Sequence, residues 1–132
     1  MPENLASVKH KRVLLAEDNE LNRKVTLAML KHLGYRADTV LNGIDVLLAL
    51  KHKQYDLILM NVGLPVMDGL EATRQIRKLF RNGPKIIAVT AYALPGMKQK
   101  CLEAGMDDFI IKPVRLDELG TVLRNQLSHF GT

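Results

Sequence analysis

Five short apolar runs alternate along the chain with longer segments in which apolar residues recur at intervals of three and four. Such runs are typical of strands covered on both faces, and the longer segments are typical of amphipathic helices. Strands that alternate with helices favour an α/β fold with a parallel sheet. The strands are predicted at residues 13–16, 36–40, 57–60, 86–89 and 109–111. The second run is the most polar, so it is expected at an edge of the sheet.

The first helix has the clearest signals for its two ends. Asn19 is a favourable N-cap and Gly34 a favourable stop. Between them one apolar stripe is predicted to face the core, made of Leu21, Val25, Ala28, Met29 and Leu33. Four further helices are predicted at residues 44–51, 70–80, 95–104 and 116–130.

Length and composition indicate one globular domain. The chain has 132 residues, of which 47% are hydrophobic and 25% charged. The folded domain is expected over residues 11–132, after a loose tail at residues 1–10. No apolar run is long enough for a membrane span and no signal peptide is recognisable, so no membrane association and a cytoplasmic address are expected. The single Cys101 is interpreted as a small helix residue in a reducing compartment.

The chain carries 19 Lys and Arg against 14 Asp and Glu, a net charge of +5. Basic residues gather near the N-terminus and at Arg74, Arg77, Lys78 and Arg81. The second group has helical spacing and no interleaved aromatic residues for base stacking, so it is interpreted as a solvated helix face. No direct nucleic-acid binding is assigned.

Polar residues stand where the predicted strands end. Glu17 and Asp18 follow the first strand, Asn61 the third, Thr90 the fourth and Lys112 the fifth. In parallel α/β sheets the loops after the strands share one edge, and ligands bind there. Two carboxylates with further oxygen ligands suit magnesium, and a hydroxyl with an ammonium group would hold a phosphoryl group. Each residue alone would also fit a purely structural role, such as helix-end charge or surface solvation.

Four segments resemble the receiver domains of response regulators and hybrid sensor kinases. They are VLLAEDNELNR (residues 13–23), YDLILMNVGLPVMDGLEATRQIR (55–77), IIAVTAYA (86–93) and GMDDFIIKPV (105–114). The resemblance implies a doubly wound (βα)5 fold of the flavodoxin-like, CheY-like kind with sheet order 2-1-3-4-5. It also implies that the domain is a receiver, a signalling module of a two-component phosphorelay and not an enzyme. The first helix is most similar to receivers fused to sensor kinases.

Site roles follow from the same resemblance. Glu17, Asp18, Asn61 and the backbone carbonyl of Val62 stand where receivers have their magnesium ligands, and Thr90 and Lys112 are similar to the residues that bind the phosphoryl group. The resemblance further implies that Phe109 is the switch aromatic that moves with Thr90, and that Pro113 is a cis-proline. The implied partners are a histidine kinase or a histidine phosphotransfer domain, docking near Leu21 and Asn22. A homodimer through the last two βα units, with Tyr92, Cys101 and Phe109, is a further option.

The chain departs from the family at Asn61, where receivers have the phosphoaccepting aspartate. A carboxylate oxygen attacks phosphorus to form an acyl phosphate, whereas a neutral amide is a poor nucleophile. Asn61 is therefore expected to accept no phosphate, to weaken magnesium binding, and to leave Lys112 facing Glu17, Asp18 or solvent.

Three alternatives remain open. The chain is either an ordinary receiver inactivated by one substitution or a pseudo-receiver that docks without phosphorylation. A more remote alternative is a magnesium-dependent phosphohydrolase with Asp18 as nucleophile, although the chain is too short for the usual cap insertion. A flavin carrier is disfavoured because no Ser/Thr-rich phosphate loop follows the first strand.

Overall fold

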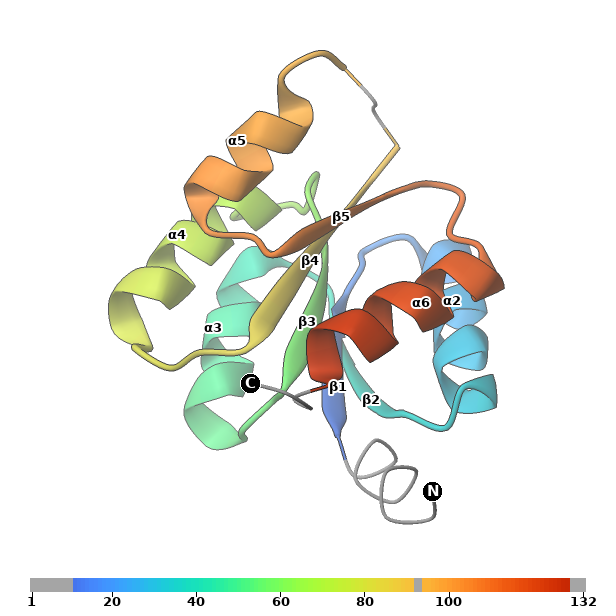
Figure 1. The fold of residues 1–132 in the computed structure, drawn as a ribbon. Coiled ribbons are helices and arrows are strands. Elements are labelled where there is room, and N and C mark those ends of the chain that lie inside the picture. Colours follow the sequence, from blue (N-terminus) through green and yellow to red (C-terminus); the bar gives the residue numbers. More distant parts are fainter. Residues whose placement is uncertain (1–10, 92–93, 129–132) are drawn as a thin grey trace.

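A computed structural model describes residues 11–91 and 94–128 and shows a five-stranded parallel sheet flanked by helices (Figure 1). The strand order is β2-β1-β3-β4-β5, which confirms the predicted order. Along the chain the elements are β1 (Arg12–Ala16), α2 (Glu20–His32), β2 (Arg36–Val40), α3 (Gly43–His52), β3 (Leu57–Asn61), α4 (Gly69–Leu79), β4 (Lys85–Thr90), α5 (Met97–Ala104), β5 (Asp108–Ile111) and α6 (Leu116–Leu127).

The central strands are apolar on both sides because both faces of the sheet are covered. Successive side chains of a strand point to opposite faces. In β1, Val13 and Leu15 join the core under α2 and α6, whereas Leu14 and Ala16 join the core under α3, α4 and α5. Figure 1 shows the two helical layers on either side of the sheet. Each fully buried Leu or Ile contributes about 1.5–3 kcal/mol, so these two cores hold the sheet together.

β2 lies at an edge, as its polar sequence predicts. Ala37 and Val40 of this strand are half-buried, and the other three side chains are exposed. The edge is tied to the start of β3 through Asp38, which accepts hydrogen bonds from Tyr55 Oη at 2.5 Å and Lys53 Nζ at 3.3 Å. These exposed polar contacts add to the packing of Ala37 and Val40 against the two cores.

α2 begins and ends close to where its sequence predicts. Asn19 Oδ1 accepts a hydrogen bond from the Asn22 amide at 2.9 Å, and Gly34 follows the helix with φ of 92°. Both ends are therefore set by local backbone chemistry that the sequence shows directly.

The apolar stripe predicted for α2 was wrong at three of its five residues, Leu21, Val25 and Ala28, which are exposed. Leu21 is 70% exposed and Val25 45% exposed, whereas the buried positions of the helix are Thr26 and Leu30. The helix is rotated so that Leu21 and Val25 border a shallow surface depression instead of the core.

Two other helices are shorter than predicted. α5 starts at Met97, because Gly96 adopts φ of 86° and interrupts the helical backbone just before it. α6 ends at Leu127, with Ser128 as its extended C-cap, so the predicted extension to residue 130 falls partly outside the described residues. Tyr92 is also outside them. Among the helices that are described, none combines the length and apolar character needed to cross a membrane.

Arg77 is not part of a solvated face, contrary to the prediction. Its guanidinium donates to the carbonyl of Gly105 at 2.9 Å, to the carbonyl of Pro84 at 2.8 Å and to Asp107 Oδ2 at 2.8 Å. The same carboxylate oxygen accepts from the Ile86 amide at 2.8 Å. Arg77 thus joins α4 to the segments that precede β4 and β5. The other three basic residues of this group, Arg74, Lys78 and Arg81, are exposed as expected.

Candidate functional site

The carboxyl edge of the sheet brings together side chains from four strand ends. Glu17 and Asp18 follow β1, Asn61 ends β3, Thr90 ends β4, and Lys112 follows β5. The Glu17 amide donates to the Val40 carbonyl at 3.1 Å, which extends the strand pairing up to the acidic pair. The clustering of these residues therefore has a simple backbone cause, since parallel strands end together.

Asn61 lies between the two carboxylates and bonds to both. Its Nδ2 donates to Glu17 Oε2 and to Asp18 Oδ1, each at 3.1 Å. On its other side, Asn61 Oδ1 accepts from the Gly63 amide at 3.1 Å. These groups suit each other chemically, because the amide nitrogen meets acceptors and the amide oxygen meets a donor.

This network determines which way the Asn61 amide points. Rotating the amide by half a turn would place Oδ1 against two carboxylates and Nδ2 against the Gly63 N–H, so attractive contacts would become repulsive ones. The amide nitrogen consequently lies between the carboxylates of Glu17 and Asp18. It supplies two N–H donors but no net positive charge.

Glu17 is the buried member of the acidic pair, with 4% of its surface exposed. Both oxygens of its carboxylate have partners: Oε1 pairs with Lys112 Nζ at 2.9 Å, and Oε2 accepts from Asn61 and from the Asn19 amide at 3.1 Å. A buried charge is costly unless it is paired and hydrogen-bonded in this way. Asp18 is exposed. The structure therefore shows Lys112 facing Glu17, one of the three positions expected for it.

Thr90 and Lys112 are joined through the backbone. The Lys112 amide donates to the Thr90 carbonyl at 2.8 Å, and the Thr90 side chain is buried. The peptide bond between Lys112 and Pro113 is cis, which is the isomer that the resemblance implies. The ends of β4 and β5 thus bring the hydroxyl and the ammonium group to the same edge as Asn61.

The loop from β3 to α4 forms one wall of the site. The Val62 carbonyl, predicted to be a metal ligand, accepts a hydrogen bond from the Gly69 amide at 2.9 Å. A Cβ on Gly69 would come within 2.5 Å of the Asn61 carbonyl oxygen, so this close approach requires glycine. A carbonyl oxygen has two lone pairs, so this hydrogen bond leaves one for a metal ion, and the role of Val62 as a ligand stays a prediction.

Phe109 is half-buried on β5 and packs against the core under α3, α4 and α5. Its register partner in β4 is Ala88, two residues before Thr90. In the described part of the chain no three His, Cys, Asp or Glu side chains converge as a metal site. A cation at this edge would therefore depend on two carboxylates plus neutral oxygens.

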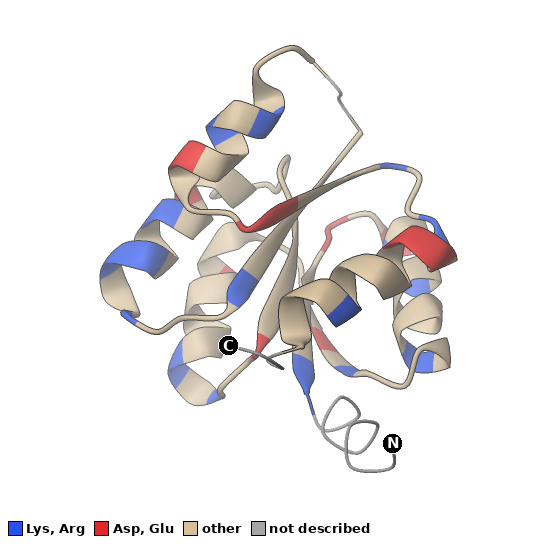
Figure 2. Ribbon diagram, in the orientation of Figure 1, with Lys and Arg blue, Asp and Glu red and all other residues tan. Residues whose placement is uncertain are grey.

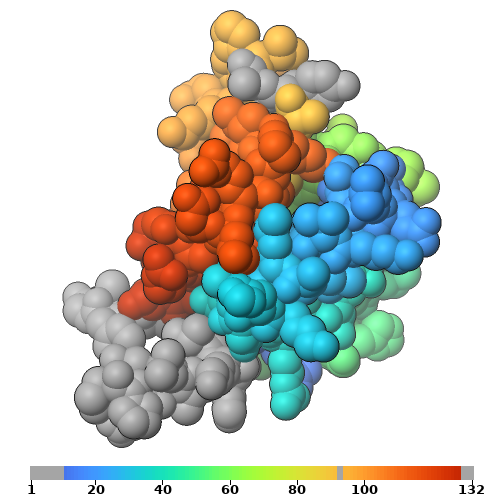
Figure 3. All heavy atoms as spheres, turned by 90° about the vertical axis from the view of Figure 1, so that its right-hand side faces the viewer, coloured from blue at the N-terminus to red at the C-terminus, as the bar shows by residue number. Residues whose placement is uncertain are grey.

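A depression lies beside the site, and two of its lining residues, Leu21 and Asn22, are where the resemblance implied that a partner docks. It has a volume of about 270 Å³, and its lining consists of Glu17, Leu21, Asn22, Val25, Thr26, Lys112, Pro113 and Val114. Figure 3 shows this face, with α2 in blue to cyan next to the orange segment that follows β5. The exposed Leu21 and Val25 were the available signal, but a helical stripe alone does not distinguish a core face from a docking face.

Comparison with known proteins agrees with this geometry. Residues 13–124 match the family model of the response regulator receiver domain. Histidine protein kinase 1 of Candida albicans is 44% identical over 131 residues, which cover 91% of this chain and 5% of that protein. Two-component system protein A of Emericella nidulans is 45% identical over 116 residues, which cover 86% of this chain and 17% of that protein.

A solved structure gives the same result. The receiver domain of a sensor histidine kinase from Pseudomonas aeruginosa PAO1 superposes with a TM-score of 0.82 at 44% identity, covering 89% of this chain and 97% of that one. That protein has a magnesium ion coordinated in its active site cleft. The match to receiver domains, together with the parallel sheet of order β2-β1-β3-β4-β5, identifies the class as a phosphorelay module.

The chain belongs to the response regulator receiver domain family. It is a receiver domain of the two-component phosphorelay, similar to the receivers of hybrid histidine kinases. It spans only 5% and 17% of the two curated relatives quoted, so the properties of those whole proteins are not transferred by the match.

Proposed function

We propose that this chain is a phosphorelay receiver held in its unphosphorylated state because Asn61 occupies the phosphoacceptor position. The observation that supports it is the contact of Asn61 with Glu17 and Asp18 at the carboxyl edge, beside Lys112 and Thr90. Membership of the receiver family favours this function over a phosphohydrolase.

The chemical step that fails is the attack on phosphorus. In a working receiver a carboxylate oxygen forms the new bond to phosphorus while the bond to the donor nitrogen or oxygen breaks, and the leaving group takes up a proton. The Asn61 oxygen carries no charge, and it already accepts a hydrogen bond from the Gly63 amide. The nucleophile is therefore both weak and turned away from the acidic pair.

Magnesium suits the donor chemistry of the site only in part. Glu17 and Asp18 are the hard oxygen ligands that this ion prefers. When bound, the ion would neutralise charge on the phosphoryl oxygens. Asn61, however, presents nitrogen to the place between the carboxylates, so binding requires its amide to rotate and to lose three hydrogen bonds. Weak magnesium affinity is the result we expect.

Thr90 and Lys112 are the proposed contacts of the phosphoryl group. Lys112 Nζ lies 2.9 Å from Glu17 Oε1 and would divide its charge between this carboxylate and the incoming phosphoryl oxygens. Phe109 is proposed to change its packing as Thr90 moves, because it lies on the neighbouring strand and is only half-buried. Without phosphorylation at position 61, nothing drives the movement of Thr90 or the repacking of Phe109.

Restoration of the carboxylate tests this proposal. The protein and its Asn61→Asp variant are incubated with acetyl phosphate and magnesium, and intact masses are compared. We expect one added phosphoryl group on the variant and none on the Asn61 protein. Asp18→Asn in the Asn61→Asp background is the matched control and should abolish or greatly slow the addition. No addition to Asn61→Asp would contradict the proposed function.

A histidine kinase or histidine phosphotransfer domain is the proposed partner, docking on the depression beside Leu21 and Val25. Both side chains are exposed apolar groups next to Lys112 and Pro113. In the Asn61→Asp background, Leu21→Lys should slow transfer from a phosphohistidine protein without slowing transfer from acetyl phosphate. If Leu21→Lys slows both reactions equally, the substitution disturbs the phosphorylation site itself, and the proposed docking surface is contradicted.

Docking without phosphorylation is the second candidate function. The exposed apolar surface on α2 supports it, because this surface does not depend on Asn61. Binding of a histidine phosphotransfer domain by the Asn61 protein, with affinity within about twofold of that of Asn61→Asp, is the expected result.

A further inference from the structure

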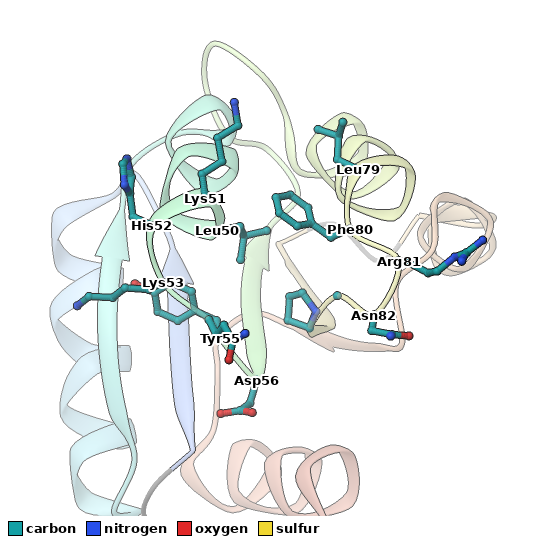
Figure 4. A pocket seen from close by; sticks show the side chains of 13 residues that line it. Leu50, Lys51, His52, Lys53, Tyr55, Asp56, Leu79, Phe80, Arg81 and Asn82 are labelled. Atoms are coloured by element: carbon teal, nitrogen blue, oxygen red, sulfur yellow. The ribbon is translucent and has the colours of Figure 1, made fainter.

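A second hollow lies at the opposite, amino edge of the sheet. It runs between the loop from α3 to β3 and the loop from α4 to β4, and its volume is about 720 Å³ (Figure 4). Leu50 and Phe80 point toward one another in its middle, and Lys51 and Arg81 extend outward around them. Here we call it the amino-edge groove, lined by residues 50–56 and 79–84.

The floor of the groove is apolar and only partly covered. Leu50, Tyr55 and Phe80 are half-buried and pack against the core under α3, α4 and α5. Leu79 at the rim is 58% exposed. This arrangement provides a place for one bulky apolar side chain, because burial of such a group is favourable by about 25 cal/mol per Å².

The rim is positively charged. Lys51, Lys53 and Arg81 line it against one carboxylate, Asp56. Asp56 Oδ2 accepts a hydrogen bond from the Arg12 amide, and Lys53 pairs with Asp38. Within residues 11–91 and 94–128, no carboxylate pairs with Lys51 or Arg81. Figure 2 shows further Lys and Arg on α4 and at the start of β1.

Helix ends explain only part of this charge. α3 and α4 both finish at the groove, and each helix C-terminus carries about half a negative charge, which Lys51 and Lys78 complement. Arg81 lies beyond the last turn of α4, so the helix C-terminus does not account for its charge. The rim remains net positive after this correction, and it suits a negatively charged occupant.

We propose that the amino-edge groove binds an acidic peptide segment of a partner protein, with one aromatic or large aliphatic side chain seated between Leu50 and Phe80. Charge complementarity favours this occupant. A second copy of this chain is disfavoured, since a symmetric contact would set two positive rims against each other. A nucleic acid is disfavoured because Tyr55 and Phe80 are half-buried and do not form a row of open rings on which successive bases would stack.

The groove and the Asn61 site lie at opposite ends of β3, which has five residues and therefore a length of about 17 Å. An occupant of the groove does not cover Asn61, Lys112 or the depression on α2. The two surfaces are thus able to bind at the same time, and the groove would anchor a partner whether or not position 61 is phosphorylated.

A labelled peptide of Asp and Glu residues around a central Phe tests the proposal by fluorescence anisotropy. The 132-residue protein is compared with Lys51→Glu/Arg81→Glu and with Lys98→Glu/Lys100→Glu on α5. Each pair of changes lowers the net charge from +5 by four units, so long-range attraction is matched. We expect about tenfold weaker binding for the groove pair and a change below about twofold for the α5 pair.

Two further probes locate the peptide on the protein. Replacing Phe by Ala in the peptide should weaken binding, and amide shift changes in NMR should gather at residues 50–56 and 79–84. No binding, equal loss in both variant pairs, shifts on another face, or tighter binding of a short RNA than of the peptide would each overturn the proposal. Circular dichroism spectra equal to that of the unchanged protein show that the groove pair and the α5 pair of variants are folded.

Discussion

Asn61 has a structural role as well as a chemical one. Its amide nitrogen bonds to Glu17 and Asp18, and its amide oxygen bonds to the Gly63 backbone. An aspartate in the same place would bring three carboxylates together beside Lys112. Like charges at this distance repel each other, so we expect the metal-free site to be more stable with asparagine than with aspartate.

Val66 has an unfavourable backbone conformation. Its φ is 70°, and the Met67 amide donates to the Pro65 carbonyl at 2.7 Å, which is the hydrogen bond of a γ-turn. A β-branched residue rarely adopts positive φ, and such strain costs about 1–3 kcal/mol. The side chain is 82% exposed, so no buried packing compensates for the strain.

Val66→Gly should therefore stabilise the protein. We expect the free energy of unfolding to rise by about 1 kcal/mol, because relief of strain exceeds the added chain entropy of glycine. Urea denaturation measures the change. Val66→Ala is the matched control and should gain less, since it keeps a Cβ at the same φ. A loss of stability in Val66→Gly would contradict this account of the turn.

At the scale of elements, we expect the contact between the edge strand β2 and the segment just before β3 to depend on pH. Burial, together with the hydrogen bond to Asp38, raises the pKa of Tyr55 to about 12. The hydrogen bond from Tyr55 is the main cause that lowers the pKa of Asp38. The pair is therefore most stable with Tyr55 neutral and Asp38 ionised.

The stabilisation by this pair has a defined pH window. A folded-state pKa raised from 10.0 to about 12 means that the Tyr55 contribution is complete below pH 10 and lost as the pH rises through 12. The lowered pKa of Asp38 means that its contribution is present above its usual pKa of 3.8 and lost as the pH falls below it. Tyr55→Phe should cost up to about 1 kcal/mol at neutral pH.

Urea denaturation of both proteins across pH measures this difference. It should shrink above pH 10 and at acid pH, since the hydrogen bond between Tyr55 and Asp38 is lost there. Thr39→Val, on the same exposed strand but outside the pair, should show no such dependence. A constant difference from acid to alkaline pH would contradict the proposed coupling.

Most helices and strands were predictable, because buried parallel strands appear in the sequence as apolar runs. The side of α2 that packs on the core was not predictable. Leu21 and Val25 have the helical spacing of a core stripe, yet they are exposed beside Pro113. The spacing of apolar residues shows that a helix has an apolar face, but it does not show whether the core or a partner protein covers that face. Arg77 was misjudged for a related reason: its partners Gly105 and Asp107 are distant in sequence.

At the scale of the whole molecule, the sheet separates two surfaces. Its carboxyl edge holds Glu17, Asp18, Asn61, Thr90 and Lys112, and their common location was predictable because parallel strands end at one edge. The direction of the Asn61 amide was not predictable, because it depends on the Gly63 backbone N–H. The amino edge holds the basic groove, which forms from two loops that no sequence pattern joins.

Magnesium titration of this protein beside its Asn61→Asp variant tests the central claim most directly, with calorimetry as the measurement. One unit of charge about 4 Å from a cation is worth between about 1 and 4 kcal/mol per cation charge, so we predict at least about tenfold tighter binding by Asn61→Asp. Asp18→Asn, which removes a carboxylate from the same pair, should bind more weakly than either protein. Equal magnesium affinity of the Asn61 protein and its Asn61→Asp variant would contradict the claim that Asn61 weakens magnesium binding at this site.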